Sequence, residues 1–168
     1  MGIARKTVIE AGSTNIDGLV WIKPKMFEDQ RGFFQEIFHA DRYGQNGVEH
    51  NFVQQNHSRS TQHVLRGLHY QKKNPQSQLV TVFSGTVFYA CVDLRRHSNT
   101  FLQCDCRRLG EKDFTQVFQP PGVAGGYCVL TEIADIHYNV SELYDPNDEV
   151  GLDGMTRVWR YHGLLKRF

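Results

Sequence analysis

The strongest structural signal in the chain is a pair of strand-like runs near its middle. Leu79–Phe83 and Thr86–Val92 are rich in β-branched and aromatic residues, and only Ser84-Gly85 separates them. Two such runs joined by a short glycine-containing turn predict a β-hairpin. Both runs are apolar at nearly every position, so both faces are expected to be covered, as in the interior of a β-sandwich or barrel.

Shorter strand candidates recur along the rest of the chain, with turn residues between them. They are Val20–Ile22, Phe33–Phe38, Asn51–Gln54, Asp113–Phe118, Tyr127–Leu130 and Ala134–Asn139. Helical patterning is weak and limited to a turn near His39–Tyr43. This pattern predicts an all-β fold, a double-stranded β-helix or jelly roll with few short helices. No linker or repeat interrupts it, so residues 1–168 are expected to form a single domain.

Composition and charge exclude several classes of protein. Lys and Arg number 19 against 18 for Asp and Glu, a balance that argues against a nucleic-acid-binding protein. No apolar run approaches the roughly 20 residues of a membrane helix, and the N-terminus lacks the apolar stretch of a secretory signal. The four cysteines form no C-x-x-C motif and are expected to be core residues. A cytoplasmic protein is the resulting expectation.

The eight histidines raise the question of a metal site. Two ligands on one strand face would be expected two residues apart, and the chain contains no H-x-H pattern. His63 and His69 are an even number of residues apart, but they flank Arg66-Gly67, where a bend is expected. We therefore expect no bound metal.

A polar strand followed by an arginine and a histidine is the best candidate for a functional site. The polar residues alternate along the chain at Gln54, Asn56, Ser58 and Ser60, so an extended strand would direct all four to one face. That face is either a solvated outer surface or a wall that hydrogen-bonds a ligand. Arg66 and His69 follow closely. They favour the ligand-binding interpretation, because arginine suits phosphate recognition and histidine suits proton abstraction near neutral pH.

A second candidate cluster lies nearer the N-terminus. In an extended segment Arg31 shares one face with Phe33 and Gln35, whereas Phe34 and Glu36 share the other. An arginine, an aromatic ring and a carboxylate are suited to binding a phosphate, stacking on a base and accepting a hydrogen bond from a nucleobase or sugar. A surface strand with an ordinary ion pair accounts for the same residues equally well.

Six motifs in register give the chain a resemblance to a known family. They are Asp29-x-Arg31-Gly32-x-Phe34-x-Glu36, Gln54-x-Asn56-x-Ser58-x-Ser60, Leu65–Gln71, Val92–Arg95, Pro120-x-Gly122-x-Ala124, and Tyr138 with Tyr144-Asp145-Pro146. Over about residues 8–160 the chain resembles the dTDP-4-dehydrorhamnose 3,5-epimerase family of nucleotide-sugar epimerases.

The resemblance implies a cupin-like enzyme without metal or cofactor, usually a homodimer, that acts on a nucleoside-diphosphate 4-keto-6-deoxy sugar. The C4 ketone acidifies the hydrogens at C3 and C5, so a base can remove one and leave an enolate. Reprotonation from the opposite face of the ring inverts that carbon. His69 matches the family's base and Tyr138 its acid. The positions that match the family's substrate contacts are Arg31, Phe34, Glu36, Gln54, Asn56, Ser58 and Arg66.

The chain also departs from the family pattern. Gln78 stands where the family has a lysine that stabilises the enolate, and Tyr89 stands where an acidic residue pairs with that lysine. We keep Gln78 as a substrate contact, because an amide can donate a hydrogen bond to an enolate. Gly125 replaces a histidine and is expected to leave a roomier site. No carboxylate in Leu164–Phe168 matches the one that orients the family's histidine, so the partner of His69 is left open.

The sequence therefore predicts an isomerase that epimerises C3, C5 or both. It leaves open a dTDP, CDP or GDP nucleotide and a hexose or a heptose. The alternative is a nucleotide-sugar binding protein that kept the pocket without catalysis. His69 and Tyr138 favour the enzyme, because binding alone needs neither a base nor an acid.

Overall fold

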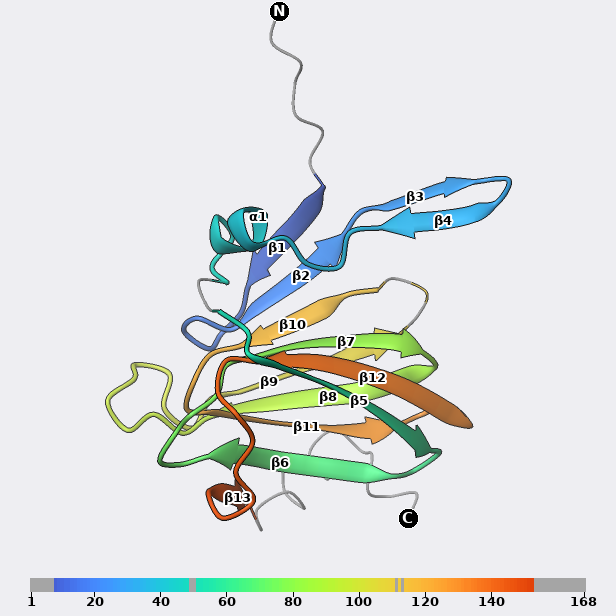
Figure 1. The fold of residues 1–168 in the computed structure, drawn as a ribbon. Helices are drawn as coiled ribbons and strands as arrows, with labels where there is room; N and C mark the ends of the chain where they lie inside the picture. Colours follow the sequence, from blue (N-terminus) through green and yellow to red (C-terminus); the bar gives the residue numbers. More distant parts are fainter. Residues whose placement is uncertain (1–7, 49–50, 111, 113, 153–168) are drawn as a thin grey trace, which may run out of the picture.

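The computed structural model describes residues 8–48, 51–110, 112 and 114–152, and about half of them belong to two facing antiparallel sheets (Figure 1). The first sheet has the strand order β1 (Ile9–Ser13), β2 (Val20–Pro24), β10 (Gln116–Gln119), β7 (Gln78–Ser84), β12 (Ile133–Val140), β5 (Gln54–Thr61). The second has the order β13 (Glu149–Gly151), β6 (Leu65–Gln71), β11 (Val123–Val129), β8 (Thr86–Asp93), β9 (Cys104–Gly110). This arrangement confirms the all-β, cupin-like jelly roll.

The main core fills the space between the two sheets. Val80 and Ile136 from the first sheet meet Val87 and Tyr89 from the second, and all four are buried. Successive residues of a strand point to opposite faces, so β8 sends Val87 and Tyr89 inward. Ala90, the residue after Tyr89, points the other way and belongs to a separate cluster on the outer face. The central strands are therefore apolar on both faces, as their sequences indicate.

The predicted hairpin at Leu79–Val92 is wrong, although both of its strands exist. β7 pairs with β10 and β12 in the first sheet, whereas β8 pairs with β11 and β9 in the second. The Ser84-Gly85 turn carries the chain from one sheet to the other. Gly85 has a φ of +75°, and a Cβ there would lie 2.1 Å from the carbonyl oxygen of Ile133, so the corner requires glycine. Each run has both faces covered because one face packs in the core between the sheets and the other packs in an outer cluster, with Leu79 on the outer face of β7 and Ala90 on that of β8.

The predicted helical turn is confirmed as α1 (Ala40–Gly44), capped by His39. Tyr43 of α1 is fully buried against the outer face of the first sheet, where it packs with Ile22 and Phe118. Its hydroxyl donates to Gln116 Oε1 at 2.8 Å. In the described part of the chain, no helix is long and apolar enough to cross a membrane.

The other strand predictions vary in accuracy. Val20–Ile22 falls within β2 and Ala134–Asn139 within β12. Asn51–Gln54 is wrong except for its last residue, because β5 begins at Gln54. The remaining candidates overlap strands in part, and residue 113 lies outside the described residues. Phe33 and Phe34 lie in a separate hairpin of β3 (Met26–Asp29) and β4 (Gly32–Gln35), which extends away from the two sheets (Figure 1).

Candidate active site

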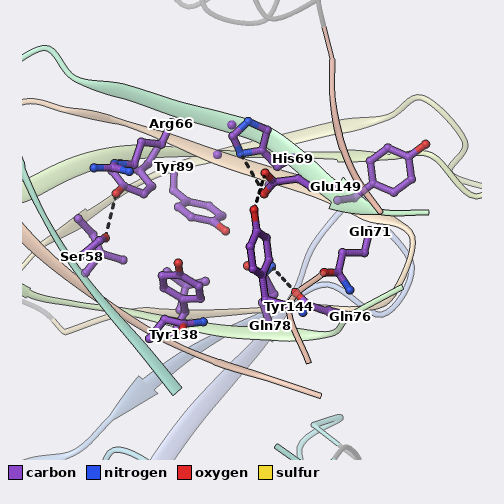
Figure 2. Close-up of a pocket in the computed structure, with 18 of the residues that line it drawn as sticks. Ser58, Arg66, His69, Gln71, Gln76, Gln78, Tyr89, Tyr138, Tyr144 and Glu149 are labelled. Carbon is purple, nitrogen blue, oxygen red and sulfur yellow. Dashed lines mark hydrogen bonds and ion pairs between the residues drawn. The ribbon is translucent and has the colours of Figure 1, made fainter. Parts of the chain in front are cut away.

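A cavity of about 360 Å³ opens between the two sheets, within the size range of small-molecule sites. Both sheets line it. β5, β7 and β12 contribute one wall, and β6, β8, β11 and β13 contribute the other (Figure 2). The cavity is thus lined by strands of both sheets of the jelly roll, so its side chains are held by ordered backbone on both sides.

His69 and Tyr138 lie on opposite walls of this cavity. His69 is on β6 of the second sheet and is half-exposed, and Tyr138 is on β12 of the first sheet and is half-buried (Figure 2). Burial raises the pKa of Tyr138, and the neighbouring Tyr127 adds to this, so the phenol stays protonated at neutral pH. A titratable imidazole thus faces a phenolic proton donor across the cavity.

The alternating polar residues of β5 face the cavity and not the outer solvent. Gln54, Asn56 and Ser58 line it, whereas the intervening His57 and Arg59 lie on the exposed face and contact Asp135. The Gln54 amide donates to Asn56 Oδ1 at 2.9 Å. This bond occupies the acceptor of Asn56, which leaves its amide N–H groups as donors toward a ligand.

Arg66, on β6 of the second sheet, brings a permanent positive charge to the cavity. Its Nε donates to Ser60 Oγ at 3.1 Å, and this bond orients the guanidinium. Ser58 and Ser60 also lie 3.1 and 3.4 Å from the hydroxyl of Tyr127, so the hydroxyls behind Arg66 form one connected network. An oriented guanidinium at the edge of a cavity suits a phosphate or an enolate oxygen.

Gln78 lies on β7 and lines the cavity. Its amide donates to Gln76 Oε1 at 3.4 Å, and the Gln76 amide donates to the carbonyl of Glu142 at 2.7 Å. This chain of amides fixes the direction of Gln78. The second N–H of its amide group remains as a neutral donor at the position where the family resemblance implies an ammonium group.

The expectation of a roomier site at Gly125 is wrong. A Cβ at this position would lie 2.0 Å from Gln119 Oε1 and 2.7 Å from the hydroxyl of Tyr89. The Tyr89 hydroxyl donates to Gln119 Oε1 at 3.1 Å, and Gln119 Nε2 donates to the carbonyl of Val123 at 2.8 Å. Burial raises the pKa of Tyr89, so this pair is neutral. Two buried polar side chains therefore fill the space that the missing side chain would occupy.

Sequence reasoning missed Glu149 as a site residue and included Tyr144 only as part of a motif. Glu149 Oε1 lies 3.8 Å from His69 Nδ1, and the Tyr144 hydroxyl donates to Glu149 Oε2 at 3.1 Å (Figure 2). Gln71 fixes the loop that leads to them, because its Oε1 accepts the backbone N–H of Asp145 at 2.7 Å. A three-residue strand such as β13 has no periodicity that would have identified Glu149.

Three predicted substrate contacts lie outside this cavity. Arg31 and Phe34 belong to the β3–β4 hairpin, where Arg31 is paired with Asp29 and Phe34 is 69% exposed. Glu36 follows that hairpin and is paired with Arg42, whose Nε donates to Glu36 Oε1 at 2.7 Å. The structure thus divides the predicted contacts into a group inside the cavity and a group on a separate hairpin.

Comparison with known proteins identifies the family. A family model described as dTDP-4-dehydrorhamnose 3,5-epimerase matches residues 13–156. The chain is 39% identical to the dTDP-4-dehydrorhamnose 3,5-epimerase of Methanothermobacter thermautotrophicus, with 83% of this chain and 75% of that protein covered. It is 34% identical to a dTDP-4-dehydrorhamnose 3-epimerase of Streptomyces niveus, with 82% and 67% covered.

A solved structure agrees with these relatives. The fold matches a dTDP-6-deoxy-D-glucose-3,5-epimerase of Legionella pneumophila, in complex with dTDP-4-keto-L-rhamnose, with a TM-score of 0.83 and 42% identity over 86% of this chain and 77% of that chain. The comparisons confirm the predicted isomerase that epimerises a nucleotide sugar and do not favour the binding-protein alternative. The chain belongs to the dTDP-4-dehydrorhamnose 3,5-epimerase family.

Proposed function

We propose that this protein inverts C3, C5 or both of a dTDP-linked 4-keto-6-deoxy sugar, with His69 as the base and Tyr138 as the acid. The main support is the placement of these two side chains on opposite walls of one cavity. Inversion requires that the proton leaves one face of the sugar ring and returns from the other. The choice of dTDP is supported by the names of the relatives and by the dTDP-sugar in the Legionella complex.

In the proposed reaction His69 removes the proton from the carbon beside the C4 ketone. The C–H electron pair becomes a C–C double bond, and the carbonyl π pair moves to the oxygen to give an enolate. The enolate carbon then takes the phenolic proton of Tyr138 from the other face, and the ketone re-forms. The Tyr138 phenolate and the His69 imidazolium return to their starting states by proton exchange with solvent. The raised pKa of Tyr138 keeps the acid protonated between turnovers.

Gln78 and Arg66 are the proposed partners of the enolate and the phosphates. The second N–H of the Gln78 amide donates to the enolate oxygen, and the guanidinium of Arg66, on the facing wall, contributes positive charge or binds the pyrophosphate. A neutral amide stabilises an oxyanion less than an ammonium group does. The cavity residues Gln54, Asn56 and Ser58 are the proposed contacts to the sugar and the nucleotide.

The experiment that tests this function measures proton exchange in deuterated water. We expect incorporation of deuterium at C3, C5 or both of a dTDP-4-keto-6-deoxy sugar, and incorporation at C3 alone would identify a 3-epimerase like the Streptomyces relative. CDP- and GDP-linked sugars, including a 4-keto heptose, serve as the comparison substrates. Absence of deuterium at both carbons with every substrate, under conditions in which a known family member exchanges, would refute the proposal.

We also propose a homodimer in which the β3–β4 hairpin reaches the cavity of the partner. The hairpin exposes Phe33 and Phe34 at 57% and 69%, which is unusual for a solvated turn and typical of an interface. It carries the predicted contacts Arg31 and Phe34 but extends away from the cavity of its own chain (Figure 1). In such a dimer, Arg31 and Phe34 would contact a nucleotide that is bound in the cavity of the partner.

Mixing two inactive variants tests this arrangement. His69→Asn removes the base, and Phe34→Ala removes the aromatic ring of the hairpin. If the hairpin acts on the partner, a mixed dimer contains one cavity with both His69 and Phe34 intact. Random exchange of subunits would then restore about a quarter of the wild-type activity, because half of the dimers are mixed and each has one complete site. No recovery after proven subunit exchange would show that the hairpin serves its own chain or no site.

The proposal extends to the whole chain and to its location. We propose one epimerase domain over residues 1–168, since the family model spans 13–156. We propose a cytoplasmic location because all four cysteines are free thiols, as is usual in reducing compartments.

A further inference from the structure

The short strand β13 places a carboxylate beside the imidazole of His69. In the antiparallel pairing of β13 with β6, Glu149 lies opposite Gln71 and Gly151 lies opposite His69. Glu149 and His69 are therefore diagonal neighbours on the same face of the sheet, within reach of long side chains. Both side chains line the cavity, and Glu149 Oε1 lies 3.8 Å from His69 Nδ1.

The carboxylate of Glu149 is itself held in place. The Tyr144 hydroxyl donates to Glu149 Oε2 at 3.1 Å, which leaves Oε1 to face the imidazole. This hydrogen bond, together with the negative charge of Glu149, raises the pKa of Tyr144, as expected for a phenol that donates to a carboxylate. The backbone N–H of Tyr144 donates to Gln54 Oε1 at 3.0 Å. Tyr144 is therefore anchored to β5 of the opposite sheet.

The geometry assigns different tasks to the two ring nitrogens. A carboxylate beside Nδ1 stabilises the tautomer that carries its proton on Nδ1, and this tautomer leaves the lone pair on Nε2. The distance of 3.8 Å suits an ion pair and exceeds a hydrogen bond, and such contacts tighten when substrate closes the site. The attraction becomes strongest after proton abstraction, when the imidazole is positively charged.

We propose that Glu149 is a positioning residue for the base: it accepts the Nδ1–H of His69, so that Nε2 is the nitrogen that takes the substrate proton. This inference rests on the function proposed above. Tyr144 contributes indirectly, because its hydroxyl holds the carboxylate of Glu149 in place. Among the described residues, Glu149 is the carboxylate at ion-pair distance from His69, and it answers the question that the sequence left open.

Kinetics of matched variants provide the first test. Glu149→Gln keeps an acceptor oxygen but removes the charge, and Glu149→Leu removes both. We expect the rate of exchange (kcat) to fall by about 10- to 100-fold in Glu149→Leu and by less in Glu149→Gln, with dTDP affinity unchanged. The control is Glu132→Gln, which removes the same charge from an exposed site in the turn before β12 and is expected to leave kcat unchanged. In a His69→Asn background, Glu149→Leu should cause no further loss, because its effect acts through His69.

The tautomer of His69 provides a test that does not depend on activity. Nitrogen-15 NMR of the free protein at about pH 8.5, where imidazoles are neutral, distinguishes a protonated ring nitrogen from a bare one. We expect the Nδ1–H form to predominate in the wild type and to lose this predominance in Glu149→Leu. An inactive wild-type protein would refute the epimerase proposal and leave this measurement intact. An unchanged tautomer, an unchanged kcat in Glu149→Leu, or an equal loss of kcat in Glu132→Gln would overturn the role of Glu149.

Discussion

Gly125→Ala tests how tightly the cavity wall formed by Gly125, Gln119 and Tyr89 is packed. The added Cβ would lie 2.0 Å from Gln119 Oε1 and 2.7 Å from the Tyr89 hydroxyl, both far below van der Waals contact. Gln119 is the side chain that must move, yet it is 1% exposed and has no solvent to move into. Its displacement breaks its hydrogen bonds with Tyr89 and with the carbonyl of Val123.

The expected loss of stability follows from these two broken hydrogen bonds and from the crowding around the added methyl group. A buried polar group left without a partner costs about 1–3 kcal/mol, and overpacking a core costs about 1–3 kcal/mol. Because relaxation recovers part of both terms, we expect Gly125→Ala to lower the free energy of unfolding by about 2–4 kcal/mol. For a domain of this size, that corresponds to a decrease in Tm of about 5–15 °C.

Urea denaturation with two controls measures the effect. Gly12→Ala makes the same substitution on β1, where a Cβ would have nothing within 4 Å, so it reports the general consequence of replacing glycine in a strand. Gln119→Ala removes the side chain that clashes, and in that background Gly125→Ala should lose most of its cost. The reasoning is refuted if Gly125→Ala destabilises no more than Gly12→Ala, or if its cost is the same with and without Gln119.

Three further predictions concern the proposed acid and base and one buried carboxylate. His69→Asn is expected to abolish deuterium exchange, by at least about 1000-fold, while the circular dichroism and thermal melt stay those of a folded protein. Tyr138→Phe should reduce inversion more than exchange, so NMR would detect deuterated substrate with retained configuration; an equal fall of both rates would contradict its role as the acid. Burial alone would raise the pKa of Asp93, but hydrogen bonds from Arg95, Ser98 and Thr100 outweigh it and lower the pKa below its usual range. The stability from this carboxylate is therefore present above about pH 4 and lost as the pH falls through the lower folded-state pKa. Asp93→Asn should cost about 2–4 kcal/mol at pH 7 in urea denaturation, and the deficit should shrink at acidic pH.

The fold class was predictable because strand patterns report burial directly. The uniformly apolar β7 and β8 correctly indicated two strands covered on both faces, and the alternation of polar residues in β5 correctly placed Gln54, Asn56 and Ser58 on one face. The pairing of β7 and β8 was not predictable from the same pattern. A short turn between apolar runs fits both a hairpin and a corner between sheets, and the choice depends on the close approach of Gly85 to Ile133, which is 48 residues later in the sequence.

The site residues that belong to sequence motifs were predictable, whereas those whose position depends on strand pairing were not. His69, Tyr138 and Arg66 followed from motifs, and the structure places all three at one cavity. Glu149 did not follow from any motif, because its contact with His69 depends on the pairing of β13 with β6. The location of Phe34 outside the cavity was likewise not predictable, since a motif specifies residue type and order but not where the segment lies in the fold.

The three departures from the family pattern at Gln78, Tyr89 and Gly125 are best explained together, because each affects the space or the charge beside the others. The resemblance implies a lysine at Gln78, an acidic residue at Tyr89 and a histidine at Gly125. Removing only the acid would leave an ammonium group without its partner, at a cost of about 3–5 kcal/mol when buried. With both charges gone, Tyr89 bonds to Gln119, and that pair occupies the volume beside Gly125. A histidine restored at position 125 alone would therefore clash with Gln119 and Tyr89, so the family's arrangement is recovered only when these two residues change together with Gln78 and Gly125.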